Sequence, residues 1–216
     1  METTLLLSFG LVDRAPVFMD IAEDRYFRLQ PDQEYEFLSS LKKLEGGPII
    51  HGLVRGFGSD EQKIEAIPLP PPPTGALPSG RGFGNSSLRD VIAASRLLRR
   101  VRRELRSRSI GDILESIVRV KRGGSSRARN PIASAIAFRS ARQLVPIRGN
   151  CLADSLALLR WLGANGDGAT LVFGVKLDPF AAHCWVQSGE ALLNDRPERI
   201  ERFTPIRIIE CTPASS

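Results

Sequence analysis

Residues 151–162 read Cys151-Leu-Ala-Asp-Ser-Leu-Ala-Leu-Leu-Arg-Trp-Leu162, an apolar run that begins with a cysteine. The preceding Pro146-Ile-Arg-Gly-Asn150 is typical of a turn, so we expect a helix that starts at Cys151. Free N–H groups and the helix dipole favour an anion at such a position, and a thiolate there has a lowered pKa. The sequence therefore predicts an activated thiol at the start of a buried helix.

The residues after this helix predict three strands. A loop is expected at Gly166-Asp-Gly168, and Ala169-Thr-Leu-Val-Phe-Gly-Val-Lys176 then has the continuous apolar character of a buried strand. A second strand is expected over residues 182–187 and a third over residues 191–194, after a turn at Ser188-Gly189.

The second of these strands contains one of the two histidines of the chain, His183. Side chains alternate along a strand, so His183 and Trp185 share one face and Cys184 points to the other. Cys184 is therefore not expected to be the nucleophile if His183 is the base. Asp195 follows the neighbouring antiparallel strand, where a carboxylate can hydrogen-bond the imidazole and stabilise the imidazolium.

Cys151, His183 and Asp195 also have an ordinary structural interpretation. A buried cysteine is most often an inert small hydrophobe, and a lone histidine is usually a polar group with satisfied hydrogen bonds. However, a cysteine at a helix start, a histidine on a strand and an aspartate on the next strand follow the order of papain-like and transglutaminase-like folds. This order favours a catalytic interpretation, and the structural one stays open beside it.

The positive charge of the chain is concentrated in its middle. Residues 1–75 contain 7 Lys and Arg against 12 Asp and Glu, residues 85–150 contain 16 against 4, and residues 151–216 contain 6 against 8. So many arginines in one segment indicate binding to nucleic acid, to an anionic membrane surface or to an acidic partner. The alternative is that they form a solvated helix face with no binding role. Nucleic acid is disfavoured, because no aromatic residues that could stack on bases are interspersed.

The sequence pattern of residues 1–68 predicts a small α+β module of the winged-helix type. Residues 17–29 are expected to form two short strands around a turn, followed by a helix from Pro31 to about Leu44, a short helix in the apolar residues 49–57 and a strand at 64–67. The negative charge of this part opposes phosphate binding. An extended peptide added to an exposed sheet edge is the expected partner, and a purely structural cap on the rest of the chain is the alternative.

A proline- and glycine-rich stretch separates the acidic and basic parts. Residues 69–84 read Leu69-Pro-Pro-Pro-Pro-Thr-Gly-Ala-Leu-Pro-Ser-Gly-Arg-Gly-Phe-Gly84, and consecutive prolines lack donors and favour an extended geometry. We place a linker here, between a first domain over residues 1–68 and a second over residues 85–216. The second is expected to begin with three helices, over residues 86–108, 109–120 and 131–144.

The composition argues against several classes of protein. The chain of 216 residues has 42% apolar residues, but no run approaches the roughly 18 apolar residues of a membrane span, and its first residues lack an export signal. Its 3 cysteines form no CxxC pair and its 2 histidines are far apart, so we expect no disulfide framework, no metal and no cofactor. A soluble, cytoplasmic protein that does not insert into membranes is expected.

Several stretches together resemble a known family. They are the run Cys151 to Leu162, Leu171-Val-Phe-Gly-Val175, Pro179-Phe-Ala-Ala-His-Cys-Trp-Val186, Asn194-Asp195 and Phe203-Thr-Pro-Ile206. With these motifs the chain resembles the leader peptidases of lasso peptide biosynthesis, the B proteins of the transglutaminase-like superfamily. Val17-Phe-Met-Asp-Ile and Asp24-Arg-Tyr-Phe-Arg-Leu29 are similar to the precursor-recognition module of that family, so the chain resembles the form in which both parts are fused.

The resemblance implies a transglutaminase-like, papain-like cysteine protease domain in which Cys151, His183 and Asp195 are the catalytic triad. The expected reaction is cleavage of a ribosomally made precursor between leader and core, with a lasso cyclase as a further partner. The residue after the histidine is commonly small in this family, whereas here it is Cys184. No P-loop occurs in the chain, so no nucleotide is assigned to it.

The leader of the precursor is expected to bind the edge of the N-terminal sheet. The candidate contacts are Arg25, Tyr26, Phe27, Arg28 and Leu29. Ordinary strand packing is the alternative role for these residues. Three other functions remain open for the whole chain: a nucleic-acid-binding regulator that uses residues 85–150, a module that binds the precursor without cutting it, and an acyl-transferring enzyme with the same nucleophile.

Overall fold

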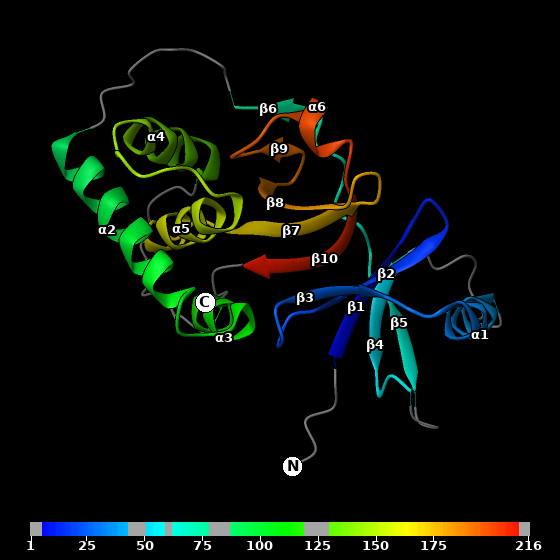
Figure 1. Cartoon of the computed structure of the whole chain (residues 1–216). Coiled ribbons are helices and arrows are strands. Elements are labelled where there is room, and N and C mark those ends of the chain that lie inside the picture. The colour runs from blue at the N-terminus through cyan, green and yellow to red at the C-terminus, as the bar shows by residue number, and fades with distance from the viewer. Residues whose placement is uncertain (1–5, 43–50, 59–61, 78–86, 119–129, 212–216) are drawn as a thin grey trace.

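The computed structural model describes residues 6–42, 51–58, 62–77, 87–118 and 130–211. The N-terminal sheet is antiparallel, with the strand order β3-β2-β1-β4-β5 (Figure 1). Its strands are β1 (Leu6–Val12), β2 (Ala15–Asp20), β3 (Arg25–Arg28), β4 (His51–Arg55) and β5 (Lys63–Ala66), and helix α1 (Pro31–Lys42) packs against it. Aromatic rings fill this contact, and the ring centroids of Phe18 and Phe37 are 5.0 Å apart.

Much of this half agrees with the sequence. The predicted hairpin is confirmed as β2 and β3, with Val17 opposite Arg28, and the helix from Pro31 and the last strand are also confirmed. The predicted short helix over residues 49–57 is wrong in its described part. Residues 51–55 form β4 instead, because their backbone groups pair with β1 on one side and β5 on the other. β1 was not predicted, and the winged-helix-like arrangement stays a prediction.

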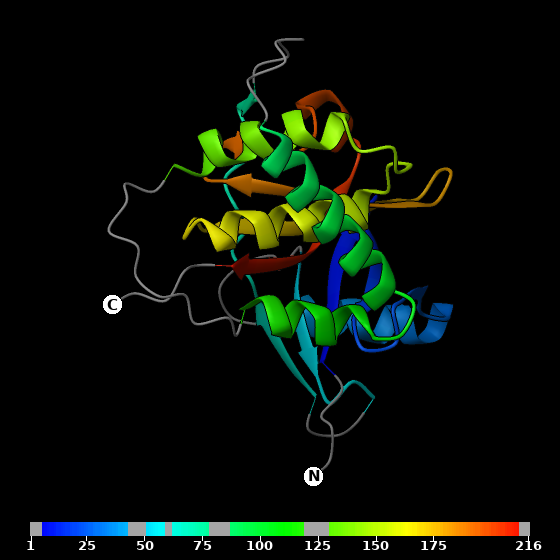
Figure 2. The ribbon, with the colours of Figure 1, turned by 90° about the vertical axis from the view of Figure 1, so that its left-hand side faces the viewer.

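The C-terminal sheet has the strand order β10-β7-β8-β9-β6. Its strands are β6 (Gly75–Ala76), β7 (Ala169–Lys176), β8 (Ala181–Ser188), β9 (Ala191–Leu192) and β10 (Thr204–Cys211). Helices α2 (Leu88–Glu104), α3 (Ile110–Val118), α4 (Pro131–Gln143) and α5 (Cys151–Ala164) lie along one side, and the short α6 (Pro197–Ile200) precedes β10 (Figure 2). Over the described residues, no helix combines the length and apolar composition needed to cross a membrane.

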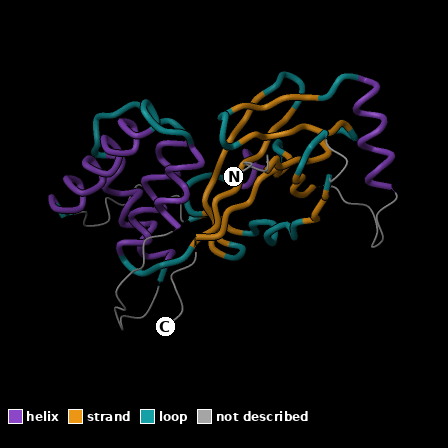
Figure 3. The backbone as a smooth tube through the Cα atoms, turned by 90° about the horizontal axis from the view of Figure 1, so that it is seen from below, coloured by secondary structure: helices purple, strands orange, loops and turns teal. Residues whose placement is uncertain are grey.

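The α+β class and the predicted helices and strands of this half are confirmed in their described parts, although β9 is shorter than expected. The α2–α5 helices gather on one side of the molecule and the two sheets on the other (Figure 3). Ser87, Asn130 and Asn150 cap α2, α4 and α5, because each side chain accepts a backbone N–H three residues later. The predicted helix ends at residues 44, 86 and 120 lie outside the described residues.

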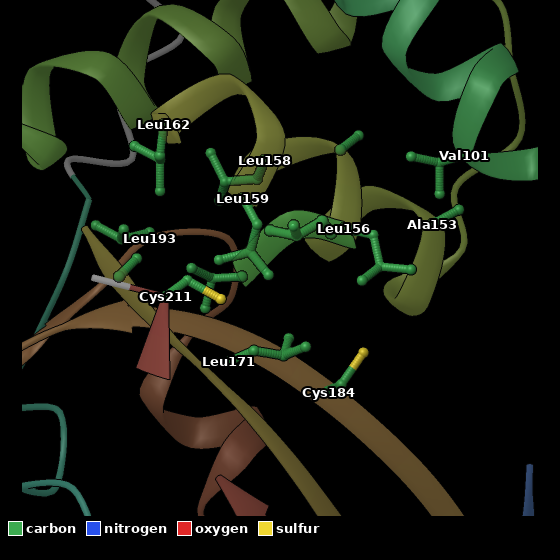
Figure 4. Packing of buried hydrophobic residues seen from close by; sticks show 14 of the residues in the cluster. Val101, Ala153, Leu156, Leu158, Leu159, Leu162, Leu171, Cys184, Leu193 and Cys211 are labelled. Carbon is green, nitrogen blue, oxygen red and sulfur yellow. The ribbon is translucent and has the colours of Figure 1, made fainter. Parts of the chain in front are cut away.

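Helix α5 is at the centre of the largest hydrophobic core. Side chains of α5 face β7 and β8 on one side and α2 on another (Figure 4). The labelled residues include Leu156, Leu158, Leu159 and Leu162 of α5, Leu171 of β7, Cys184 of β8 and Val101 of α2. A helix buried on several faces needs apolar residues nearly all round, which is why its sequence is an almost continuous apolar run.

The N-terminal sheet packs directly against the C-terminal half, because β1 crosses β10 (Figure 1). Gly10 of β1 comes so close that an added Cβ atom would lie 2.5 Å from Cγ2 of Ile206. The core around α5 also contains three residues of β1 and β2: Val12, Val17 and Met19. The two halves therefore share one core, and this contact positions the N-terminal sheet relative to the start of α5.

Part of the segment predicted as a linker joins the C-terminal sheet. Residues 75–76 form β6, which pairs in parallel with β9. Gln187 of β8 donates from Nε2 to the main-chain oxygen of Pro71 over 2.9 Å. Residues 78–84 lie outside the described residues, and the division into two domains stays a prediction.

Candidate active site

Cys151 is the first residue of α5. Asn150 caps the helix: its Oδ1 accepts the Ala153 N–H over 3.0 Å, and its main-chain oxygen accepts the Asp154 N–H over 2.9 Å. Among the described residues, the N–H groups of Cys151 and Leu152 have no hydrogen-bond partner. Two free donors at a helix N-terminus stabilise negative charge, so this end of α5 suits a thiolate and an oxyanion.

The turn before Cys151 is held by a partly buried ion pair. Arg142 of α4 donates from Nε to Oδ1 of Asp154 over 2.9 Å, and from Nη2 to the main-chain oxygen of Ile147 over 2.9 Å. Oδ2 of Asp154 also accepts the N–H of Asn150 over 3.3 Å. These bonds join the turn to both α4 and α5, so the position of the thiol depends on residues of two helices.

The imidazole of His183 lies between the Cys151 thiol and a carboxylate. Its Nε2 atom is hydrogen-bonded to Oδ2 of Asp195, and the ring lies near enough to the Cys151 thiol for the two groups to shift each other's pKa. His183 is only 5% exposed. Asp195 follows β9, and its Oδ1 accepts the N–H of Arg196 over 2.9 Å. The structure thus brings together the three residues that the sequence singled out.

The charged forms of Cys151 and His183 stabilise each other. Hydrogen bonds from the Cys184 thiol and from His183 lower the pKa of Cys151 to about 4, although burial opposes the shift. Burial alone would lower the pKa of His183, but the bond to Asp195 and the negative charge of Cys151 outweigh it and raise that pKa to about 9. At neutral pH the pair is therefore a thiolate and an imidazolium, as an activated nucleophile requires.

Cys184 lies on the other face of β8 from His183, as the alternation predicted. The ring of His183 lies near Phe203, with 5.1 Å between the ring centroids, whereas the Cys184 thiol is 3.7 Å from the Ser155 hydroxyl of α5. Cys184 also lies close enough to Cys151 for the two thiols to shift each other's pKa, which the sequence did not predict. The neighbouring Cys151 and burial raise the pKa of Cys184, so this thiol stays protonated.

All three residues lie within the part of the chain that matches a known family. Residues 89–208, more than half of the chain, match the model of the transglutaminase-like superfamily. The chain belongs to that superfamily. Over 59 residues it is 37% identical to the microcin J25-processing protein McjB of Escherichia coli, a stretch that makes up 27% of this chain and 28% of McjB. No solved structure matches the chain significantly.

Two cavities lie at opposite ends of this transglutaminase-like site. A cavity of about 430 Å³ opens beside the Cys151 thiol, and a larger one of about 940 Å³ lies behind Asp195. The first is lined by Asp24, Arg102, Leu105, Arg106, Ile110, Asn150, Cys151, Leu152 and Ala153. Of these two cavities, the first is the one lined by Cys151, so it is the candidate substrate site despite the larger volume of the other. Of the two arginines in this first cavity, Arg102 belongs to α2 and Arg106 follows that helix, in the basic segment for which the sequence left several roles open.

The five candidate leader contacts on and after β3 divide between the two faces of the N-terminal sheet. Phe27 stacks on Phe18, with ring centroids 5.3 Å apart, and packs with Leu29 in the N-terminal core. Arg25 and Arg28 are exposed and pair with Asp20 and Glu34. Tyr26 packs against the C-terminal core and the ring of Phe180. Among the described residues, β3 is an edge strand of the N-terminal sheet. The backbone groups on its outer side can therefore pair with an added strand from another molecule.

Two polar residues, whose roles the sequence did not indicate, support the site. Asn194 accepts the Val186 N–H at Oδ1 and donates from Nδ2 to the Ser155 hydroxyl, both over 2.8 Å. Ser155 is fully buried on α5, one turn after Cys151. The available signal was a serine within an otherwise apolar helical run, since a buried hydroxyl needs a partner. Among the described residues, no three His, Cys, Asp or Glu side chains are arranged so that they could hold a metal ion.

Proposed function

We propose that this chain is a cysteine peptidase that removes the leader from a ribosomally made lasso peptide precursor. The hydrogen bond of the His183 imidazole to Asp195, together with the lowered pKa of the Cys151 thiol at the start of α5, is the observation on which the proposal rests. The similarity to a microcin J25-processing protein supports a peptide precursor as substrate. The triad order along the chain supports the same chemistry.

The catalytic cycle follows from the positions of these groups. The Cys151 thiolate attacks the carbonyl carbon at the junction of leader and core, and the N–H groups of Cys151 and Leu152 bind the resulting oxyanion. The His183 imidazolium gives its proton to the leaving amine of the core, which leaves the leader as a thioester on Cys151. His183 then removes a proton from water, and hydrolysis releases the leader with a free carboxylate and restores the thiolate.

Asp195 has a positioning role in this cycle. Its carboxylate orients the ring of His183 and stabilises the imidazolium that protonates the leaving amine. Burial would raise the pKa of Asp195, but the bonds from His183 and from the Arg196 N–H outweigh it and lower that pKa, so the carboxylate stays charged. A lasso cyclase is the proposed consumer of the amine that the cleavage frees.

We also propose that residues 1–68 form a winged-helix-like recognition domain, followed by a linker over residues 69–84 and the peptidase domain over residues 85–216. The leader would add as a strand to the outer edge of β3, where main-chain hydrogen bonds supply affinity. Arg25 and Arg28 are exposed there and can select the side chains of the leader. Binding energy from this remote contact would position the scissile bond at Cys151.

A cleavage assay with full-length protein tests the function. Candidate precursors taken from reading frames beside the gene are incubated with the wild type and with Cys151→Ala, and the products are weighed by mass spectrometry. The proposal predicts two fragments, a leader with a free carboxylate and a core with a free amine, from the wild type alone. A crosslinked or amidated product would assign an acyl transferase instead. Binding of a precursor that neither protein cuts would assign a recognition module.

A further inference from the structure

The cavity beside Cys151 is lined by two arginines that the proposed mechanism does not use. Arg102 lies near the end of α2 and Arg106 follows one turn later, so both side chains reach the same cavity. Cys151 and Leu152, whose free N–H groups mark the start of α5, line it as well. A substrate group in this cavity therefore lies close to the nucleophile and to two cations.

A hydrogen bond anchors Arg102 near the nucleophile. Its Nη2 atom donates to the main-chain oxygen of Arg148, which lies three residues before Cys151 in the turn that leads into α5. A guanidinium has five N–H donors in a planar fork, so most of the donors of Arg102 are left for another acceptor. The side chain is thus held beside the start of α5 and can still bind a ligand.

Neither cavity arginine has a carboxylate partner in the described part of the chain. Arg102 and Arg106 form no ion pair there, whereas Arg100 on the same helix pairs with Glu104 over 2.9 Å. Arginine in proteins typically binds carboxylates or phosphates through paired N–H groups. The two guanidinium groups are therefore free to bind an anion from outside the chain.

The carboxylate that lines the same cavity, Asp24, does not neutralise both arginines. Its Oδ1 accepts the N–H of Ile110 over 2.9 Å, and this bond holds the turn between β2 and β3 against the start of α3. Burial also raises the pKa of Asp24, so its negative charge is held less firmly than that of an exposed aspartate. The charge of the Cys151 thiolate is matched by the His183 imidazolium. The two arginines thus leave an excess of positive charge in the cavity.

We propose that Arg102 and Arg106 form a subsite for an acidic side chain of the substrate, next to the bond that Cys151 attacks. Charge-assisted hydrogen bonds from guanidinium to carboxylate would hold the acidic group. The cavity also has an apolar surface, against which the methylene groups of an Asp or Glu side chain can pack. That surface is formed by Leu105, Ile110 and Leu152.

The proposal deepens the proposed peptidase function and rests on it for the identity of the substrate as a peptide. The enzyme would then select its precursor by two separate contacts, one with the leader at β3 and one with an Asp or Glu beside the junction. The second contact lies next to the reacting carbonyl, so it would help to position the scissile bond as well as bind the peptide.

Two alkylating reagents of similar size test the subsite without a precursor. Iodoacetate has a carboxylate where iodoacetamide has an uncharged amide, and with both the Cys151 sulfur forms a bond to carbon as iodide leaves. The readout is the ratio of the two rate constants at pH 7, measured on Cys151 by mass spectrometry in full-length wild type, Arg102→Gln and Arg106→Gln. A change that merely weakens the thiolate slows both reagents and leaves this ratio unchanged.

We expect the ratio of iodoacetate to iodoacetamide rates to fall about 3–10-fold in each variant, because each change removes a positive charge close to the carboxylate of the reagent. The fall should be smaller in about 0.5 M NaCl, since salt screens charges near the surface. Arg103→Gln is the matched control, because it removes the same charge from α2 at a position outside the cavity lining. Equal ratios in the wild type and both cavity variants would overturn the proposal. So would an equal fall in Arg103→Gln, since the effect would then come from the overall charge of α2.

A precursor assay distinguishes failure of this proposal from failure of the peptidase function. A ratio that depends on Arg106 in a protein that cuts no precursor would keep the acidic subsite and reject the leader peptidase. If a precursor is cut, changing the Asp and Glu residues within about three positions of its junction to Asn and Gln should lower kcat/KM by about 10-fold in the wild type and by less in Arg106→Gln. Equal kcat/KM for both precursors, or a junction without a nearby acidic residue, would retain the peptidase and reject the subsite.

Discussion

Asn194 donates a hydrogen bond to the Ser155 hydroxyl over 2.8 Å, and this bond joins the segment before Asp195 to the helix that begins with Cys151. Ser155 also lies against Cys184 of β8, 3.7 Å from its sulfur. The two ends of the proposed triad are therefore connected through a buried polar contact on the far side of β8 from His183. Breaking this contact should disturb the site without removing any of its three reacting groups.

Asn194→Ala tests that connection. The change leaves the Val186 N–H without its partner and removes the Asn194 donor from the Ser155 hydroxyl, so we expect a loss of about 1–3 kcal/mol in the free energy of unfolding and weaker alkylation of Cys151 at pH 5–6. Asn165→Ala is the control, because that side chain bonds only the main-chain oxygen of Trp161 at the other end of α5. Urea denaturation and alkylation kinetics measure both effects. Equal pH profiles for the two variants would show that Asn194 does not position the site.

The reactivity of Cys151 should persist at acid pH. With a pKa near 4 the thiolate is present above that pH, so the alkylation rate should be nearly constant from pH 9 to about pH 5 and fall below it. In His183→Ala the thiolate loses a hydrogen bond and a positive charge, its pKa rises, and the rate at pH 5 should fall more than about 10-fold. Mass spectrometry after iodoacetamide treatment locates the adducts. Cys184 and Cys211 are buried and serve as internal controls.

Asp195→Asn should move the basic limit of catalysis. The imidazolium of His183 is present below its pKa of about 9, so precursor cleavage should decline as the pH rises through that value. Without the carboxylate the pKa of His183 falls, and the decline in kcat/KM should begin at a lower pH. An unchanged basic limit in Asp195→Asn would argue against the positioning role. Asp178→Asn, a change of the same kind in the loop before β8, is the control.

Cys184 should lower the pKa of the Cys151 thiol without acting as the nucleophile itself. Cys184→Ala removes the thiol that donates to Cys151, so the pKa of Cys151 should rise and alkylation at pH 5 should slow, with little change at pH 8. Cys184→Ser keeps a donor and should keep more of the reactivity at pH 5. Cys211→Ala removes a buried thiol from β10 and is the control. A pH profile of Cys184→Ala that matches the wild type would show that the contact has no influence on the pKa.

The shared core predicts a cost for any side chain at Gly10. A Cβ atom there would lie 2.5 Å from Cγ2 of Ile206 and 2.9 Å from the main-chain oxygen of Pro205, so Gly10→Ala should destabilise the fold by about 1–3 kcal/mol. Gly75→Ala is the control, since an added Cβ at that position meets nothing within 4 Å. Thermal unfolding of both variants measures the difference. A stable Gly10→Ala protein would mean that β1 and β10 can separate at little cost.

Several features could be predicted from local sequence because their causes are local. The cap at Asn150 and the apolar run after it predict a helix that starts at Cys151, and alternation along β8 predicts opposite faces for His183 and Cys184. In each case a few neighbouring residues contain both the signal and its physical reason.

Other features depend on contacts between segments far apart in the chain. β1 and β4 were missed because each is stabilised by pairing with the other, across a stretch that includes two more strands and a helix. β6 pairs with β9 more than 100 residues later, which a proline-rich sequence does not indicate. The hydrogen bond between Asn194 and Ser155 and the position of Asp24 beside Cys151 arise only when α5, the C-terminal sheet and the N-terminal sheet pack around one core. The residues of the site could be named from the sequence, but their mutual distances, and thus their pKa values and free donors, result from packing between elements.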